Sequence, residues 1–327
     1  MKAIIVAAAA WLALISCVPA GAQEVFPARP VQLIVPFPAG GSQDIVNRRL
    51  ADKFRELWGQ PVVVVNRTGA NGVVAWQAML AGKADGYSVL APAGQGLGYA
   101  HLMNSSITHP FLEEFIPVAG YASYPVVFLV AADLPVASMK ELGLYANKNP
   151  KLLSYGTTGV GSGGHLLFEV FKMLVRVSDD ALPAVHYPGI PPELTALAGK
   201  QILTAIMPLT SLCAKQIDAG TIRALAVSSS ARSTFRREIP TVVEQGFPEL
   251  AATDHLSYWV PAGTPPAVVA KLADATRAAL ADPEVKKRIE EMYLEPGFLS
   301  GAELRKPFEA RLAQFAPIIK KLDLRAQ

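Results

Sequence analysis

Residues 32–54 read QLIVPFPAGGSQDIVNRRLADKF, and the order of residue types predicts a strand, a tight turn and a helix. The apolar run at 33–35 resembles a buried strand, two prolines and the pair Gly40–Gly41 follow it, and helical spacing begins at Asp44. A strand that leads through such a turn directly into a helix leaves unpaired backbone N–H groups at the helix start. We expect these groups to bind the anionic end of a small molecule.

A second glycine loop, SYGTTGVGSGGHLLFEVF at residues 154–171, repeats this order of apolar strand, small polar loop and helix. Glycine lets the backbone take positive φ angles and lets a ligand approach closely. Each loop alone is consistent with ordinary helix capping. Ligands of open α/β sheets bind at the carboxyl ends of the strands, where both loops are expected to lie. Together the loops predict an anion site that needs neither Lys nor Arg.

The second loop also contains patterns that are typical of other functions. Residues 159–164 satisfy G-x-G-x-x-G, but the next strand, PAVHY at 183–187, ends without the acid that a dinucleotide site needs. A P-loop would require a lysine after the glycines, and Val160 stands where a nucleophile elbow needs glycine. His165 is interpreted as a cap or as a group behind the site. We find no set of nucleophile, base and orienting residue, and a secreted α/β enzyme stays an alternative only.

The composition argues against several classes of partner. The chain has 327 residues, 17% of them charged, and a net charge of +3 without a dense basic run, so nucleic-acid binding is not expected. Metal-ligand spacings such as C-x-x-C and H-E-x-x-H are absent and the five His are scattered, so neither a metal nor a cofactor is expected. The length allows two domains of ordinary size that share a cleft.

Residues 1–22 have the features of a secretory signal peptide. Lys2 supplies a positive start, an apolar run covers 3–15, and Ala20-Gly21-Ala22 fits the small-x-small cleavage site. The run is too short to span a membrane. We expect cleavage after Ala22 and a periplasmic protein. The alternative is a lipoprotein signal in which Cys17 carries a lipid anchor.

Short apolar runs alternate with helical patterns along the rest of the chain, which predicts parallel strands covered by helices on both faces. Two stretches are expected to connect two lobes, a strand start at 122–125 and a loop at 250–258. The first lobe would comprise residues 23–123 and 253–327, and the second lobe residues 124–252. His255 lies beside Asp254 in the second connection, and the sequence leaves open whether it faces the cleft.

Several segments together resemble one known family. In chain order they are RPVQLIVPFPAGGSQDIVNRRLADKF, GQPVVVVNRTGANGVVAWQAMLAGKADGYSVL, SYGTTGVGSGGHL, GTIRALAVSSSARS, IPTVVEQGFPEL and VPAGTPPAVVAKL. In content and spacing they are similar to the extracytoplasmic receptors of tripartite tricarboxylate transporters, also called Bug receptors, over essentially the whole chain after the leader. The resemblance implies a two-lobed α/β fold of the periplasmic-binding-protein kind, type II-like, with the ligand cleft between lobes joined by two crossing strands.

The same resemblance implies a receptor and not an enzyme. Such a protein captures a small carboxylate by hinge closure and delivers it to membrane transporter subunits of the tripartite tricarboxylate type. It is expected to act as a monomer. Signalling to a membrane sensor, in place of delivery, stays an alternative. The ligand carboxylate is expected to be held largely by main-chain N–H groups and bridging waters.

The family's binding residues transfer to three walls of the expected cleft. The first wall comprises Phe37, Ala39, Gly40, Gly41, Ser42 and Asp44. The second comprises Thr157, Thr158, Gly159, Val160, Gly161, Ser162 and His165. Tyr187 and Gly189 belong to the third wall. Whether Asp44 caps its helix or contacts bound water stays open.

Two departures from the family pattern bear on the ligand. Pro188 stands where a lysine is common in the third wall. Met207 and Pro208 stand at the end of the strand ILTAIM, where an Asp and an Asn are common. The missing Asp would suit an amino group on the ligand. We therefore expect an organic acid with an apolar or aromatic body, bound against Met207 and Pro208.

Overall fold

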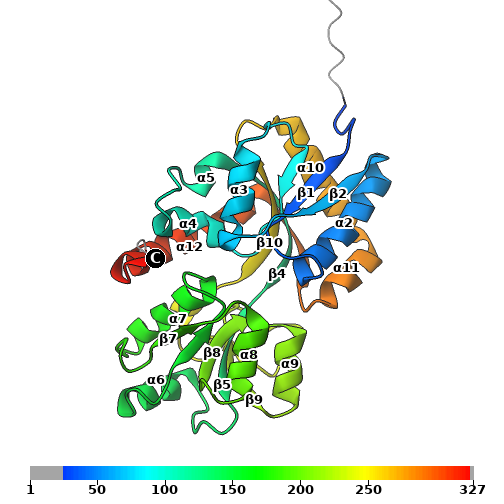
Figure 1. Cartoon of the computed structure of the whole chain (residues 1–327). Coiled ribbons are helices and arrows are strands. Elements are labelled where there is room, and N and C mark those ends of the chain that lie inside the picture. Colours follow the sequence, from blue (N-terminus) through cyan, green and yellow to red (C-terminus); the bar gives the residue numbers. More distant parts are fainter. Residues whose placement is uncertain (1–24, 325–327) are drawn as a thin grey trace, which may run out of the picture.

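The computed structural model describes residues 25–324, so the expectations for residues 1–22 and for Cys17 lie outside the described part of the chain. The described residues form two β-sheets, each with helices packed on it, and we call these units the first and second lobes (Figure 1). The α/β, two-lobed architecture expected from the sequence is confirmed. No helix within residues 25–324 is long and apolar enough to cross a membrane.

The first lobe has a six-stranded sheet. In spatial order its strands are β11 (Glu295–Ser300), β4 (Phe115–Tyr124), β10 (Asp254–Pro261), β3 (Ser88–Leu90), β1 (Val31–Val35) and β2 (Val62–Asn66). The helices of this lobe are α2 (Ser42–Trp58), η1 (Ala70–Gly72), α3 (Val73–Leu80), α4 (Gly96–Met103), α5 (Phe111–Glu114), α10 (Pro266–Ala281), α11 (Pro283–Glu290) and α12 (Gly301–Lys321).

The second lobe has a five-stranded sheet. Its strands, in spatial order, are β7 (Ala184–His186), β6 (Tyr155–Thr157), β8 (Thr204–Pro208), β5 (Val126–Ala131) and β9 (Ile222–Val227). Its helices are α6 (Met139–Lys148), α7 (Gly163–Leu174), α8 (Ile190–Ala198), α9 (Ser211–Asp218) and η2 (Pro248–Leu250).

Both sheets are mixed, which corrects the expectation of parallel strands. The strands β1, β2 and β3 run parallel, as do β6, β7 and β8. The strands next to the lobe connection, β4, β5 and β10, make antiparallel pairs. The chain leaves the first sheet along β4, enters the second along β5 and returns to the first along β10. The stretch 250–258, expected to be a loop, contains the start of β10.

The lobes are joined by strands that lie side by side (Figure 1). Only Pro125 separates β4 from β5, and β10 pairs with β4 along its whole length. Near this connection the Ser228 hydroxyl accepts a hydrogen bond from the Val126 N–H at 3.1 Å and donates one to the Ala252 carbonyl at 2.7 Å. A single buried side chain therefore links the two segments through which the chain passes between lobes.

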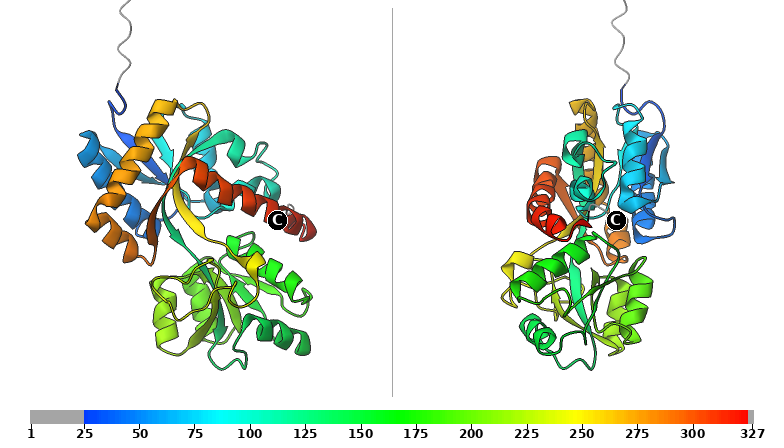
Figure 2. Two further views of the ribbon diagram at one scale, coloured as in Figure 1. Left: turned by 180° about the vertical axis from the view of Figure 1, so that it is seen from behind. Right: turned by 60° about the vertical axis from the view of Figure 1, so that its left-hand side comes forward.

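The C-terminal helix α12 contacts both lobes. Leu304 and Phe308, in its first half, lie in a buried apolar cluster of the first lobe. Phe315 and Ile318, in its second half, belong to the buried cluster that surrounds α7 of the second lobe. Figure 2 shows the end of this helix next to the second lobe. The helix therefore closes one side of the space between the lobes.

Substitution Ser228→Ala should lower the free energy of unfolding by about 1–3 kcal/mol, because it leaves a buried N–H and a half-buried carbonyl without the hydroxyl that bonds to both. Chemical denaturation measures the change. The matched control is Ser229→Ala, whose hydroxyl bonds only to the carbonyl of Ala231. Equal stability of the two variants would show that the Ser228 link contributes nothing.

Candidate functional site

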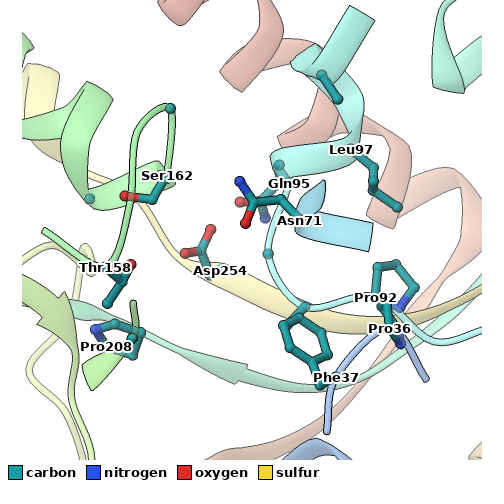
Figure 3. Close-up of a pocket in the computed structure, with 18 of the residues that line it drawn as sticks. Pro36, Phe37, Asn71, Pro92, Gln95, Leu97, Thr158, Ser162, Pro208 and Asp254 are labelled. Atoms are coloured by element: carbon teal, nitrogen blue, oxygen red, sulfur yellow. The ribbon is translucent and has the colours of Figure 1, made fainter. Parts of the chain in front are cut away.

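A cavity of about 820 Å³ lies between the lobes and is lined by residues of both (Figure 3). The first lobe contributes the loop after β1, the loop after β3, the start of α4 and part of α12. The second lobe contributes the loop after β6, the start of α8 and the end of β8. Residues that the sequence placed in the site and that line the cavity are Phe37, Gly41, Ser42, Thr158, Val160, Gly161, Ser162, Gly189 and Pro208.

The start of α2 is open toward this cavity. Gly41 is the N-cap residue and, among the described residues, no side chain caps this helix end. Gly41, Ser42 and Gln43 line the cavity. The first turn of a helix has N–H groups without carbonyl partners in the helix and carries a partial positive charge. This wall can therefore donate several hydrogen bonds to a carboxylate without a basic side chain.

Asp44 holds this loop in place and does not line the cavity. Its carboxylate accepts hydrogen bonds from the Gly40 N–H at 3.0 Å, from Arg48 Nε at 2.9 Å and from Asn66 Nδ2 at 3.0 Å. Burial by itself raises the pKa of Asp44, but the hydrogen bonds from Arg48, Gly40 and Asn66 bring the pKa below its ordinary value. Asp44 is thus an ionised anchor for the turn.

The loop after β6 is supported from behind in a similar way. The Ser162 side chain caps α7 by accepting the His165 N–H, and the Gly161 N–H donates to His165 Nδ1 at 3.0 Å. Because Nδ1 is the acceptor, the ring proton of neutral His165 is on Nε2. Burial lowers the pKa of His165 to about 3, with the neighbouring His186 and Lys172 adding to the effect. His165 is therefore a neutral support for the loop.

Behind this loop is a second, polar cavity of about 660 Å³, into which His165 and His186 face. Three of its charged groups pair with one another, since the buried Lys172 ammonium lies 2.8 Å from both Glu169 and Asp179. No group of three or more metal-binding side chains occurs among residues 25–324. The cavity thus contains the polar groups that position the loop.

Several residues expected in the site do not line the ligand-sized cavity. Met207 is fully buried in an apolar cluster on the opposite face of β8 from Ile206 and Pro208, since successive side chains of a strand alternate. The proposal that the ligand packs on Met207 is therefore wrong. The other expected residues outside the cavity lining are Ala39, Gly40, Asp44, Thr157, Gly159, His165 and Tyr187.

The structure also brings residues into the cavity that the sequence analysis missed. Gln95 and Gly96 come from a third strand–glycine–helix junction, PAGQG at 92–96, which has the same local signal as the other two. Asp254, at the start of β10, and Arg311, on α12, face the cavity from distant parts of the chain. His255 contacts the loop after β3 through its backbone, because the His255 carbonyl accepts a hydrogen bond from the Gly94 N–H.

Substitution Asp44→Ala should lower the free energy of unfolding by about 2–3 kcal/mol, because it removes an ionised acceptor from three donors. Asp52→Ala is the matched control on the same helix, where an exposed carboxylate pairs with Arg55. Urea denaturation of both variants measures the difference. A loss no larger for Asp44→Ala than for Asp52→Ala would contradict the anchoring role.

Substitution His165→Asn should change how stability depends on pH. The pKa of His165 is about 3 in the folded protein and about 6.5 when unfolded, so the unfolded chain binds more protons below pH 6.5. The stability that neutral His165 provides is lost as the pH falls from 6.5. The advantage of the wild type over the variant should narrow by roughly 2 kcal/mol between pH 7 and pH 5.

Denaturation curves at several pH values test this expectation, with His109→Asn at an exposed position as the control. The variant and the wild type having parallel pH profiles would refute it.

Comparisons with known proteins agree with this geometry. Residues 46–324 match the model of the family described as tripartite tricarboxylate transporter family receptor. A UPF0065 protein of Bordetella pertussis is 33% identical over 321 residues, which cover 97% of either chain. The solved structure of periplasmic binding protein BugD has a TM-score of 0.73 at 30% identity and covers 91% of this chain and 99% of that one.

A further solved structure, R. palustris Rpa4515 with adipate, has a TM-score of 0.76 at 31% identity and covers 90% of this chain and 97% of that one. The resemblance seen in the sequence is therefore confirmed. Family and structural neighbours alike are solute-binding receptors and not enzymes. The chain belongs to the tripartite tricarboxylate transporter family of receptors and is a solute-binding protein with a two-lobed periplasmic-binding-protein fold.

Proposed function

We propose that this receptor captures a small carboxylate in the cavity between its lobes and delivers it to membrane subunits of a tripartite tricarboxylate-type transporter. The observation that carries the proposal is the uncapped start of α2, which opens into a cavity that also borders the loop at 158–162. Unpaired N–H groups favour an anion. The adipate in the R. palustris neighbour is a molecule of this class.

The mechanism we propose is hinge closure. The lobes rotate about the adjacent strands β4 and β10, and a ligand that contacts both lobes favours the closed form. The α2 start receives the carboxylate in the first lobe, and the loop at 158–162 meets the other side of the ligand in the second. No bond is made or broken. Residues 23–123 with 253–327 move as one lobe and residues 124–252 as the other.

The cavity walls support a ligand with an apolar body. Phe37, Leu97 and Met103 from the first lobe and Val160 and Pro208 from the second provide apolar surface. The removal of such surface from water stabilises a complex by about 25 cal/mol per Å². With Met207 in the core, the argument for an apolar body rests on these walls.

The place of action follows from the N-terminal sequence. We propose that residues 1–22 direct the chain to the periplasm and are removed after Ala22, and that the mature protein acts as a monomer. A periplasmic receptor meets solutes before they reach the inner membrane and can present them to a transporter there. Loss of uptake of the bound acid in cells without the receptor would test the delivery step, whereas a sensor would leave uptake intact.

Substitution Ser42→Pro tests the anion site directly, because proline at the first position of a helix removes one N–H and keeps the helix. Gly41, the preceding residue, already has the extended backbone that a following proline requires. Affinity for a carboxylate should fall about tenfold or more, as expected for one lost charge-assisted hydrogen bond. Isothermal titration calorimetry measures it.

The matched control is Ser211→Pro, at the first position of α9 and outside the cavity lining, which should bind like the wild type. Melting temperatures of both variants check that they fold. If the two variants bind carboxylates equally well, the α2 start is not the anion site. If wild-type protein binds no carboxylate at all, the proposed function is wrong.

A further inference from the structure

Asp254 presents a carboxylate to the cavity at the point where the chain enters β10 (Figure 3). Two glycines, Gly94 and Gly163, lie close to this carboxylate. A Cβ atom on Gly94 would lie 3.3 Å from Asp254 Cγ, and one on Gly163, in the other lobe, would lie 3.7 Å from Asp254 Oδ2. The carboxylate therefore occupies a space that glycines of both lobes leave free for it.

This carboxylate lacks a donor. Within residues 25–324 no hydrogen bond or ion pair within 4 Å reaches the side chain of Asp254. Burial raises the pKa of Asp254, and the Arg311 guanidinium opposes that rise only in part. Arg311 is engaged elsewhere, since it donates to Gln314 Oε1 at 2.5 Å and lies over the Phe315 ring. A half-buried carboxylate without a donor is unfavourable until a partner arrives.

Gln95 lines the same cavity and holds the backbone next to Asp254. Its side chain is 2% exposed, and its Nε2 donates to the carbonyl of Thr253, the residue before Asp254, at 3.1 Å. That bond fixes the amide so that Oε1 is the free end, and Oε1 is buried without a hydrogen-bond partner among the described residues. Gln95 therefore fixes the chain next to Asp254 and gives the carboxylate no donor.

We propose that the ligand of this receptor carries a cationic hydrogen-bond donor, such as an ammonium group, that binds at Asp254. The inference rests on the proposed function, in which the α2 start receives the ligand's carboxylate. The ligand class is then an aminocarboxylate with an apolar body. Asp254 at the start of β10 takes the place of the Asp that the sequence lacks after β8. The proposal therefore reverses the expectation of an organic acid without an amino group.

Net charge is consistent with this class. The charged side chains that line the cavity are Asp254 and Arg311, which are of opposite sign. A ligand with one carboxylate and one ammonium adds no net charge to the closed cleft, whereas a dicarboxylate would bring two negative charges next to Asp254. Like charges at short range in a buried site repel strongly.

Calorimetry on matched pairs of ligands tests the proposal. The pairs are phenylalanine with 3-phenylpropanoate, 6-aminohexanoate with hexanoate, and glutamate with glutarate. The wild type should bind the amino member of at least one pair about tenfold or more tightly than its partner. In Asp254→Asn this preference should disappear, because the amide keeps the shape and removes the charge. Asp133→Asn, which removes only an exposed pair with Lys200, should retain the preference.

The outcomes separate this inference from the proposed function. If the deaminated acids bind the wild type more tightly and Asp254→Asn weakens them, Asp254 acts as a protonated donor to a carboxylate. The inference is then overturned and the proposed function stands. If neither member of any pair binds but another carboxylate such as adipate does, the inference fails and the proposed function stands, and if no carboxylate binds, both fail. The wild-type measurements alone decide between the ligand classes should Asp254→Asn not fold.

Discussion

The antiparallel pairing of β4 with β10 fixes where the two lobes are joined and which strand ends face each other. It runs from Tyr124 opposite Asp254 to Phe115 opposite Pro261 and connects the two lobes, which otherwise share only the apolar cluster of α4 and α12 with α7. The two adjacent connecting strands keep the lobes together, and the proposed rotation would take place about them. The ends of β1, β3, β6 and β8 then face a shared space, which is where open α/β sheets bind ligands.

Within that space, the residues that contact a ligand differ from those that shape the contact. The N–H groups at the start of α2 are usable because Asp44 holds Gly40 and the turn before the helix. The loop after β6 keeps its form because the neutral His165 accepts the Gly161 N–H. Such indirect supports are titratable groups whose pKa values are displaced by their surroundings, although neither lines the cavity.

Local features were predictable from the sequence, and features that depend on distant contacts were not. The strand–loop–helix units at 32–54 and 154–171 follow from proline, glycine and helical spacing, and α2 begins at Ser42, close to the expected Asp44. The start of β10 is polar and is a strand because it pairs with β4, so a short window could not indicate it. Arg311 reaches the cavity from a helix whose placement depends on tertiary packing alone.

The error at Met207 has a different origin. A strand end was expected to contribute two successive residues to the cavity, whereas alternation allows only every second one, and Ile206 and Pro208 are the pair that faces it. The junction PAGQG at 92–96 shows the opposite case, in which a readable local signal was overlooked. The two-residue period of the strand and the pattern of the glycine junction are both present in the sequence and indicate these two features.

Helix α12 limits how the lobes can move. Its first half is committed to the core of the first lobe and its second half to the apolar cluster around α7. A single helix is stiff, so any wide opening must detach one half and expose Phe315 and Ile318 to water at about 25 cal/mol per Å² of apolar surface. Separation of the lobes on the α12 side is therefore opposed by apolar packing, and a rotation that opens the cleft meets less resistance on the opposite side.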